Sequence, residues 1–157
     1  MSDAYAQRLA EWIRANAVEA QQRTFDVSTH SVAEAAAAVG ASAEDFVKSI
    51  CMLRQGEGAQ EMIVAVVKGE DRASTTRVGE LLGARVRLAK PDEMLAMTGY
   101  PAGGTPPFGF AAHFLVDERV MERAFVWAGG GSDRALVRIA PAELVRANAG
   151  LVVRVRK

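Results

Sequence analysis

Lys48 is the charged side chain of this sequence whose position is best suited to chemistry. It lies where a short amphipathic segment passes into an apolar one, with Phe46, Val47 and Ile50 around it. A lysine in such a place either extends its ammonium group to the surface or points into a cleft. For a lysine considered alone, the first arrangement is favoured. In the second, the ammonium group would be a fixed positive charge for a phosphate or a carbonyl oxygen.

A second candidate is the segment from Thr98 to Gly109. It contains four of the 14 glycines and three of the five prolines. Proline has no amide donor and glycine raises the entropic cost of regular structure, so this density excludes a helix or a central strand. Tyr100 and Phe108 are large apolar anchors, which a flexible linker lacks. We therefore predict an ordered loop whose glycines expose backbone amides and carbonyls, a kind of loop that often has a function.

Other catalytic and metal-binding patterns are missing from the sequence. It contains no Cys-x-x-Cys, His-Glu-x-x-His or Gly-x-Ser-x-Gly motif, and segment 99–104 lacks the lysine–serine ending of a phosphate-binding loop. His30 and His113 have no metal-like spacing, so a structural or surface role is favoured for both. Cys51 is expected to be buried and inert, and Asp117 is expected to cap a helix. We expect no metal ion and no cofactor.

The composition is that of an ordinary globular domain. The chain has 157 residues, half of them apolar, and equal numbers of acidic and basic residues give a formal net charge of zero. Such a chain is poorly suited to binding along a DNA duplex, which requires many phosphate contacts. No run is apolar enough for a membrane span, and Asp3, Arg8 and Glu11 leave no apolar core for a signal peptide. With its single cysteine the sequence fits a reducing cytoplasm, and we expect neither a DNA nor a membrane partner.

The pattern of apolar residues, caps and breakers predicts intermixed helices and strands. The expected helices are 3–20 (capped by Ser2), 32–39, 43–47, 75–82, 91–97 and 141–149, and the expected strands are 48–53, 61–67, 85–88, 112–116, 124–127, 134–139 and 151–155. Short turns join several neighbouring strands, which favours a mixed sheet curled over helices rather than a doubly wound parallel sheet. We interpret 1–157 as a single domain with an N-terminal helix within 1–22 and a core over 24–157.

Three sequence features follow one another in a characteristic order. They are Ser-Val-Ala-Glu-Ala-Ala at 31–36 with Gly40, then Val-Lys-Ser-Ile at 47–50, then Thr-Gly-Tyr at 98–100 running into Gly-Gly-Thr-Pro-Pro-Phe-Gly at 103–109. Together they resemble the YbaK/ProX family, also called the prolyl-tRNA synthetase-associated editing domain. The segments 116–118 and 128–130 also fit that pattern. The resemblance spans roughly residues 24 to 150, and the lysine and the loop are specific in combination.

The resemblance implies a fold and an activity. The fold is of the α+β type, with a mixed, mostly antiparallel, barrel-like sheet surrounded by helices. The activity is hydrolysis of the ester that joins a wrong amino acid to the 3′ end of a tRNA. Because the chain has no room for synthetase domains, it resembles the free-standing members that act in trans. The implied partners are the acceptor end of a mischarged tRNA and, as a second candidate, an aminoacyl-tRNA synthetase. A tRNA-Pro carrying a small wrong amino acid such as alanine or cysteine is the implied substrate.

The resemblance also assigns three catalytic residues. Lys48 corresponds to the family's lysine, and Gly103 and Gly104 belong to its Gly-x-x-x-Pro loop. The family is thought to use the terminal ribose hydroxyl of the substrate and a water molecule held by backbone groups of the loop, so that no Ser-His or Cys-His pair is needed. We expect Lys48 to anchor either the phosphate of the terminal adenosine or the aminoacyl carbonyl.

The implied substrate-binding residues come from the loop and from two other segments. The loop contributes Thr105, Pro106, Pro107, Phe108 and Gly109, of which the prolines would hold the glycines in position. Phe25, Thr29 and Ser49 are candidates for lining the amino-acid pocket, with core packing or local capping as the alternative for each. Two other functions stay open: a non-catalytic module that binds a tRNA end or a synthetase, and a hydrolase of another ester or nucleotide.

Overall fold

The computed structural model describes residues 3–56 and 60–157. Within these ranges, none of the helices has the length and apolar character needed to cross a membrane. The elements in chain order are α1 (Ala4–Ala15), β1 (Ala20–Thr24), α2 (Val32–Val39), η1 (Ala43–Asp45), β2 (Val47–Arg54), β3 (Met62–Lys68), α3 (Thr75–Leu82), β4 (Val86–Leu88), α4 (Pro91–Thr98), β5 (His113–Val116), η2 (Glu118–Glu122), β6 (Val126–Gly129), β7 (Ala135–Ile139), α5 (Pro141–Asn148) and β8 (Leu151–Val152).

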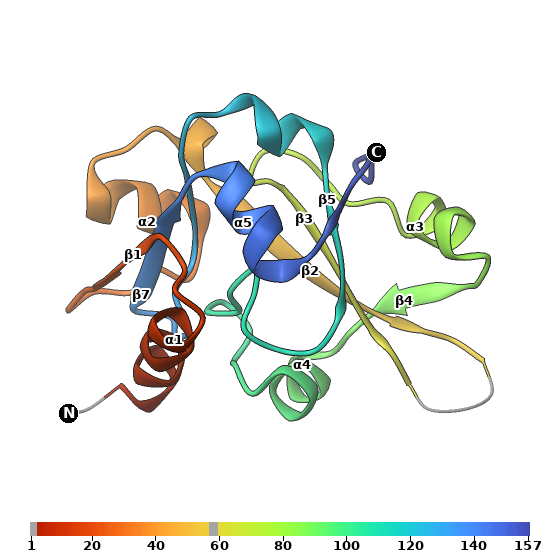
Figure 1. Cartoon of the computed structure of the whole chain (residues 1–157), viewed down its shortest axis with the longest axis horizontal. Helices are drawn as coiled ribbons and strands as arrows, with labels where there is room; N and C mark the ends of the chain where they lie inside the picture. Colours follow the sequence, from red (N-terminus) through yellow and green to blue (C-terminus); the bar gives the residue numbers. More distant parts are fainter. Residues whose placement is uncertain (1–2, 57–59) are drawn as a thin grey trace.

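The described strands form two sheets (Figure 1). The three-stranded sheet has the order β1-β7-β6 and is antiparallel throughout. The five-stranded sheet has the order β4-β2-β3-β5-β8, in which the first two pairs are antiparallel and the last two are parallel. The predicted mixed, mostly antiparallel α+β fold is therefore confirmed. The sheets do not close into a barrel, because the described backbone links them next to β6 only by an isolated bridge from Phe46, just before β2, to Trp127.

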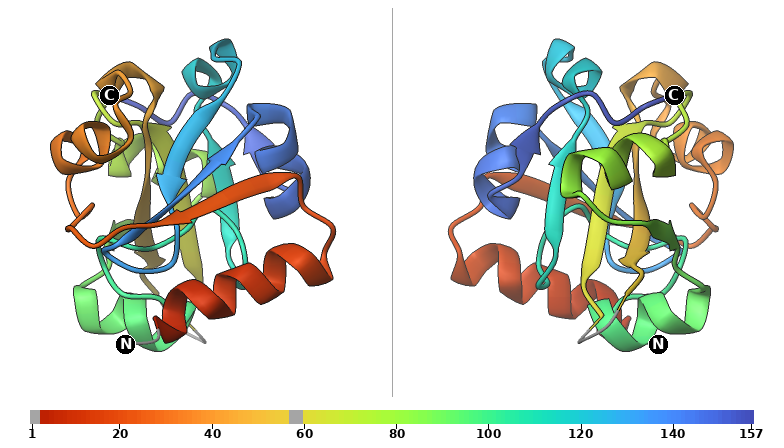
Figure 2. Two further views of the ribbon diagram at one scale, coloured as in Figure 1. Left: turned by 90° about the vertical axis from the view of Figure 1, so that its left-hand side faces the viewer. Right: turned by 90° about the vertical axis from the view of Figure 1, so that its right-hand side faces the viewer.

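The main hydrophobic core lies between the two sheets. Alternation along each strand directs every second side chain inward, so that Val64 and Val66 of β3 share this core with Val126 of β6 and Val137 of β7. Helix α3 covers the other face of the five-stranded sheet, and α2 covers part of the other face of the three-stranded sheet. Figure 2 shows α1 running alongside β1 at one side of the molecule. The helices thus leave part of the outer face of the small sheet uncovered.

Short-range signals begin and end the helices as predicted. The Ser31 side chain accepts a hydrogen bond from the Glu34 amide, and α2 stops at Gly40, where φ is 66°. Helix α3 stops in the same way at Gly83, where φ is 65°. Glycine adopts this left-handed conformation without the steric cost that a Cβ atom imposes, which explains why it ends both helices.

The N-terminal helix is shorter than predicted. It ends at Ala15 rather than at residue 20, because the chain turns at Ala17 (φ 50°) and the next segment pairs with β7 as strand β1. Asp3 caps the helix by accepting a hydrogen bond of 3.0 Å from the Ala6 amide. The predicted cap, Ser2, lies outside the described residues. The apolar spacing of Val18 reflects burial in the core beyond the helix end.

Candidate active site

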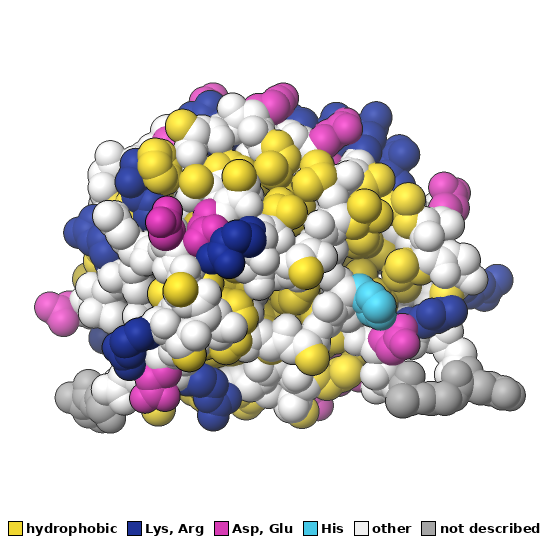
Figure 3. All heavy atoms as spheres, in the orientation of Figure 1, with side chains coloured by type: hydrophobic (Ala, Val, Ile, Leu, Met, Phe, Trp, Pro, Cys, Tyr) yellow, Lys and Arg dark blue, Asp and Glu magenta, His cyan; other side chains and the backbone are white. Residues whose placement is uncertain are grey.

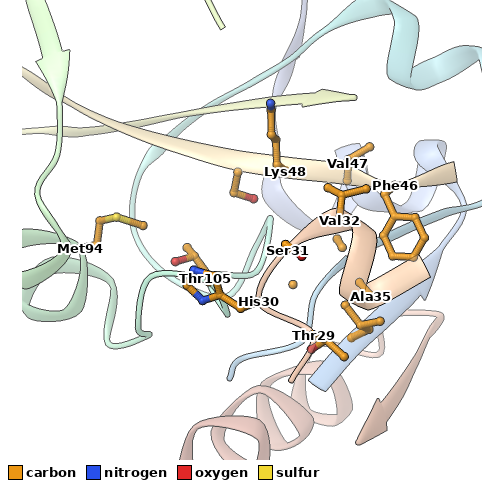
Figure 4. A pocket seen from close by; sticks show the side chains of 15 residues that line it. Thr29, His30, Ser31, Val32, Ala35, Phe46, Val47, Lys48, Met94 and Thr105 are labelled. Atoms are coloured by element: carbon orange, nitrogen blue, oxygen red, sulfur yellow. The ribbon is translucent and has the colours of Figure 1, made fainter. Parts of the chain in front are cut away.

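A small pocket opens between the start of α2, the start of β2, helix α4 and the glycine-proline loop (Figure 4). Its volume is about 150 Å³. Five of the residues predicted for the site line it, namely Thr29, Lys48, Ser49, Gly103 and Thr105. Residues that lie far apart in the sequence therefore meet around one cavity.

The turn before α2 forms one wall of this pocket and is held by hydrogen bonds. The amide and hydroxyl of Thr29 both donate to the carbonyl of Asp133, at 2.6 and 3.1 Å. The His30 amide donates to the Ser28 hydroxyl at 3.2 Å, and Ser31 caps the helix that follows. The backbone around His30 is thus fixed, while no hydrogen bond holds its imidazole to the rest of the described chain. The Thr29 hydroxyl is already occupied and has less capacity to bind a ligand.

Strand β2 brings Lys48 and Ser49 to the pocket. Lys48 is among the residues that line the cavity, but in Figure 4 its side chain extends from β2 away from His30 and Thr105. Among the described residues, no carboxylate lies within ion-pair distance of Lys48, whereas the other lysine nearby, Lys68, pairs with Glu70 at 2.8 Å. Lys48 therefore borders the cleft, while its ammonium group points away from it, which is nearer to the first of the two arrangements considered for this lysine.

Gly103 contacts His30 directly. Its φ of 86° is a conformation that favours glycine, and a side chain at this position would collide with the His30 imidazole. The missing Cβ therefore allows a histidine from the turn before α2 to lie against the backbone of the loop. An imidazole, a bare backbone segment and the Ser49 side chain consequently line the same small cavity.

Gly104 has a different environment from Gly103. Its Cα packs against the backbone of Ser132 in the β6–β7 hairpin, where a Cβ atom would not fit. Its amide donates to the carbonyl of Pro101 at 3.1 Å, and its carbonyl accepts from the amide of Gly131 at 2.8 Å. Both backbone polar groups of Gly104 are thus used inside the protein. Gly104 therefore connects the loop to the β6–β7 hairpin by close packing and a backbone hydrogen bond.

The rest of the predicted loop residues lie outside the pocket and hold the loop in place. Pro106, Pro107 and Phe108 are buried, and the carbonyl of Pro107 accepts a hydrogen bond of 3.0 Å from Asn148. The Phe108 ring stacks on Trp12 of α1 with a centroid distance of 5.4 Å. Gly109 lies next to α1 as well, where an added Cβ atom would be 3.3 Å from Leu9. Helix α1 therefore supports the loop.

Phe25 also lies outside the pocket. It packs at the edge of the cluster formed by Ala35, Phe46, Trp127 and Leu136. The guanidinium of Arg23 lies over its ring at 5.3 Å from the centroid. Phe25 thus packs behind the pocket wall, which agrees with the core-packing alternative considered for it.

The remaining reactive groups do not form a nucleophilic or metal-binding centre in the described parts of the chain. Burial raises the pKa of the Cys51 thiol to about 12, so the thiol stays protonated and unreactive at neutral pH. His113 is exposed and lies 3.5 Å from Glu61. Over residues 3–56 and 60–157, no three His, Cys, Asp or Glu side chains are grouped as metal ligands. The pocket therefore offers hydrogen bonds and a positive charge rather than a strong nucleophile.

Sequence reasoning missed several pocket residues, of which His30 is the most reactive. The others are mainly apolar and include Val32, Ala35, Phe46, Met94 and Leu136. One available signal was the position of His30 directly before a helix cap, where the chain is fixed and its side chains face a neighbouring segment. The contact with Gly103 could not be predicted, because it depends on how two distant segments pack.

The chain is similar in sequence to known proteins. Residues 26–147 match the model of a family described as the aminoacyl-tRNA editing domain. The uncharacterized protein YwhH of Bacillus subtilis (strain 168) is 29% identical over 136 residues, which cover 85% of this chain and 82% of YwhH. A proline–tRNA ligase of Nitratidesulfovibrio vulgaris (strain DP4) is 33% identical over 81 residues, which are 51% of this chain and 13% of the ligase.

Two solved structures have the same fold over nearly the full chain. The hypothetical protein APE2540 has a TM-score of 0.86 and 34% identity, with 96% of this chain and 99% of that one covered. A protein proposed to be a trans-editing enzyme for prolyl-tRNA synthetase has a TM-score of 0.88 and 29% identity, with 100% of this chain and 99% of that one covered. The chain therefore belongs to the aminoacyl-tRNA editing domain family, the YbaK/ProX family that its lysine and its glycine-proline loop resemble.

Proposed function

We propose that this chain hydrolyses the ester bond of a mischarged tRNA in trans. The observation that supports this most directly is that Lys48, Ser49 and His30 all border one small pocket beside Gly103. Within the described residues, none of these three side chains has a hydrogen bond or an ion pair with protein. Polar groups that a fold leaves without partners around a cavity are candidates for binding a ligand.

The size and lining of the pocket favour a small amino acid. Val32, Ala35, Phe46 and Leu136 give one side of the cavity an apolar surface within a volume of about 150 Å³. A pocket of this kind discriminates by size, and one methylene group changes selectivity by about 1–3 kcal/mol. Together with the similarity to proline–tRNA ligases, this supports tRNA-Pro carrying alanine or cysteine as the substrate.

The proposed reaction needs no covalent intermediate, because an aminoacyl ester is already activated. A water oxygen attacks the ester carbonyl carbon, the bond from that carbon to the ribose oxygen breaks, and the ribose oxygen takes up a proton. The products are the free amino acid and a tRNA with a free 3′-terminal ribose hydroxyl. Gly103 and His30 are the groups proposed to contact the water and the ester. Gly104 positions the loop rather than contacting substrate, since its backbone groups are already bonded.

Lys48 is proposed to bind a phosphate of the terminal nucleotide. Of the two partners considered for it, the phosphate fits better, because its ammonium group extends away from His30 and Thr105 and so away from the proposed place of the ester. An ammonium group is a compact charge that binds phosphate without a fixed approach geometry. This contact would orient the ribose ester over the loop.

Deacylation of a panel of mischarged tRNAs tests the proposal. Each tRNA is incubated with the protein, and loss of its amino acid is compared with loss in buffer. We expect alanyl- or cysteinyl-tRNA-Pro to lose its amino acid faster than the buffer control and prolyl-tRNA-Pro to be spared. If no tRNA in a broad panel is deacylated faster than in buffer, the chain is not this enzyme. Tight binding of the same tRNAs without turnover would instead indicate the non-catalytic module.

A further inference from the structure

The outer face of the three-stranded sheet carries two arginines that lie over aromatic rings. The guanidinium of Arg138 on β7 lies 3.9 Å from the centroid of Phe125, and that of Arg23 on β1 lies 5.3 Å from Phe25 and 6.0 Å from Trp127. Such cation–π contacts fix the planar guanidinium flat against a ring. The in-plane N–H donors of each arginine then remain available to a ligand.

Strand register places these side chains on one surface. Arg138 is paired with Gln21 on one side and Trp127 on the other, and Arg23 is paired with Leu136. Since Val126 and Val137 face the core, alternation directs Arg23 and Arg138 to the outside. The two arginines are diagonal neighbours on adjacent strands, a relation that brings long side chains within reach of one another. Gln21, Arg23, Phe125 and Arg138 are called the arginine face below.

Only part of this side of the sheet is covered by protein. Helix α2 packs over Trp127 and Leu136, but Phe125 remains 45% exposed and Arg23 is also exposed. Figure 2 (left) brings β1, the edge strand of this sheet, to the front. The arginine face is therefore accessible from solvent in the described structure.

Neither arginine of this face has an acidic partner among the described residues. Some arginines elsewhere in the described chain are paired, such as Arg87 with Glu93 at 2.7 Å and Arg119 with Asp71 at 2.7 Å, whereas others, such as Arg154, are not. Two like charges on adjacent strands repel one another, which disfavours the arrangement unless an anion binds there. The charge of the face is thus complementary to a polyanion, although the chain as a whole is neutral.

The arginine face also adjoins the pocket. Leu136, the cross-strand partner of Arg23, lines the cavity, and so does Phe46, whose ring stacks on Trp127 with a centroid distance of 6.4 Å. A chain that enters the pocket with its end would therefore pass close to this surface. Such a ligand would combine one small terminal group with a series of phosphates behind it.

We infer that the arginine face binds the phosphates of the acceptor stem of the tRNA whose 3′ end enters the pocket. This inference rests on the proposed function, since it takes a tRNA as the occupant. Double-stranded RNA is recognised mainly through its shape, its 2′-hydroxyls and its phosphates, and arginine forms bidentate bonds with phosphate. The aromatic rings hold the guanidinium groups before binding, which reduces the entropy lost when phosphate is bound.

The competing surface is a second group of basic residues. Figure 3 shows Lys and Arg side chains gathered near the C-terminal end of the chain, apart from the charges that alternate in sign elsewhere on that view. Arg154 belongs to this C-terminal segment, beyond the edge strand β8 of the other sheet, and is exposed. It provides a control variant with the same change of charge.

The test measures how tightly the protein binds an acceptor-stem RNA hairpin that ends in CCA and carries no amino acid. Fluorescence anisotropy reports this binding at several salt concentrations. We expect Arg23→Gln and Arg138→Gln each to weaken binding about threefold to tenfold, the usual worth of an exposed charge-assisted contact. Each should also reduce the slope of log affinity against log salt by about 1. Arg154→Gln should leave both unchanged. Arg23→Lys and Arg138→Lys, which keep the charge, should recover part of the affinity, and thermal melting checks that every variant is folded.

Two outcomes would overturn the inference. One is hairpin binding that is unchanged in folded Arg23→Gln and Arg138→Gln variants, and the other is binding that only Arg154→Gln weakens. A deacylation assay separates this inference from the proposed function, since the arginine variants should raise KM for mischarged tRNA without changing kcat. If no tRNA is hydrolysed but hairpin binding still depends on both arginines, the arginine face stands as an RNA-binding surface and the proposed deacylase fails.

Discussion

Two clusters of polar side chains in this molecule differ in how completely the protein satisfies them. The Asp117 carboxylate is fully buried and accepts four hydrogen bonds: from the amides of Val155 (2.8 Å), Arg156 (3.0 Å) and Arg119 (3.1 Å), and from the Arg156 guanidinium (2.9 Å). Burial opposes its ionisation, but these donors hold the pKa of the carboxyl below its usual value. The cluster ties η2 to the C-terminal segment.

The pocket cluster is the opposite case. Lys48, His30 and Ser49 line one cavity, yet within the described chain none of their side chains is bonded to another protein group. His30 is exposed, and Lys48 and Ser49 are half-buried, so their polar groups are free to bind a ligand at the cavity. The firmly bonded Asp117 is therefore structural, while Lys48, which no described carboxylate pairs with, is a candidate for function.

The largest expected effect is on stability, at Asp117. We expect Asp117→Ala to lower the free energy of unfolding by about 3–5 kcal/mol, because the Arg156 guanidinium, the buried Val155 amide and two half-buried amides lose this acceptor. Urea denaturation measures the loss. Glu118→Ala is the matched control, since this carboxylate is exposed and lies 3.4 Å from the same guanidinium; it should cost at most about 0.5 kcal/mol. Equal losses for the two variants would contradict the structural role of Asp117.

Lys48→Ala should have the opposite effect, with a large loss of activity and little change in stability. We expect kcat/KM for deacylation to fall about 10²-fold. A loss of this size is typical when an active site loses one preorganised donor that stabilises negative charge. The free energy of unfolding should change by at most about 0.5 kcal/mol, because Lys48 forms no ion pair in the described structure. Lys157→Ala, which removes an exposed positive charge outside the pocket, serves as the control for both measurements. Unchanged deacylation in Lys48→Ala would remove this lysine from the site.

Gly103→Ala should affect both stability and activity. The positive φ alone should cost about 1–2 kcal/mol of unfolding free energy, and the added methyl group should displace the His30 imidazole and reduce kcat/KM. Gly83→Ala is the matched control, because Gly83 has a φ of 65° with no atom within 4 Å of an added Cβ. It should lose similar stability and keep full activity. If both variants retain activity to the same extent, the contact between His30 and Gly103 has no catalytic consequence.

The smallest effect concerns pH. The Arg87 guanidinium, with the Lys90 amide, lowers the pKa of Glu93 from 4.5 to about 2. A carboxyl whose pKa is depressed by folding stabilises the fold above its unfolded pKa and loses this contribution as pH falls through the folded one. The difference in Tm between the wild type and Glu93→Gln should therefore be largest at neutral pH and vanish near pH 2. As a control, the Tm of Lys48→Ala should depend on acid pH as that of the wild type does, since no described carboxylate pairs with Lys48. A Tm difference between the wild type and Glu93→Gln that stays constant with pH would contradict the assignment for Glu93.

The local structure of this protein could largely be predicted from its sequence. Ser31 with Glu34, Gly40, Gly83 and Pro91 begin or end helices where they were expected to, because capping and left-handed glycine depend on a few neighbouring residues. The strand β3 was also predicted, because a continuous apolar run can be recognised from neighbouring residues alone. Lys48 and the glycine-proline loop were identified as two parts of one site, and the structure places Lys48, Gly103 and Thr105 around the same pocket.

What the sequence did not determine depends on contacts between distant segments. The end of α1 at Ala15, the stacking of Trp12 on Phe108 and the separation of the strands into two sheets follow from packing, not from local preference. The same holds for the different environments of Gly103 and Gly104, which are neighbours in sequence and identical in type. One lies against His30 at the pocket and the other against Ser132 in the hairpin. The sequence alone therefore determined which loop and which lysine are the candidates, while the packing of the sheets decided which residues of that loop line the pocket.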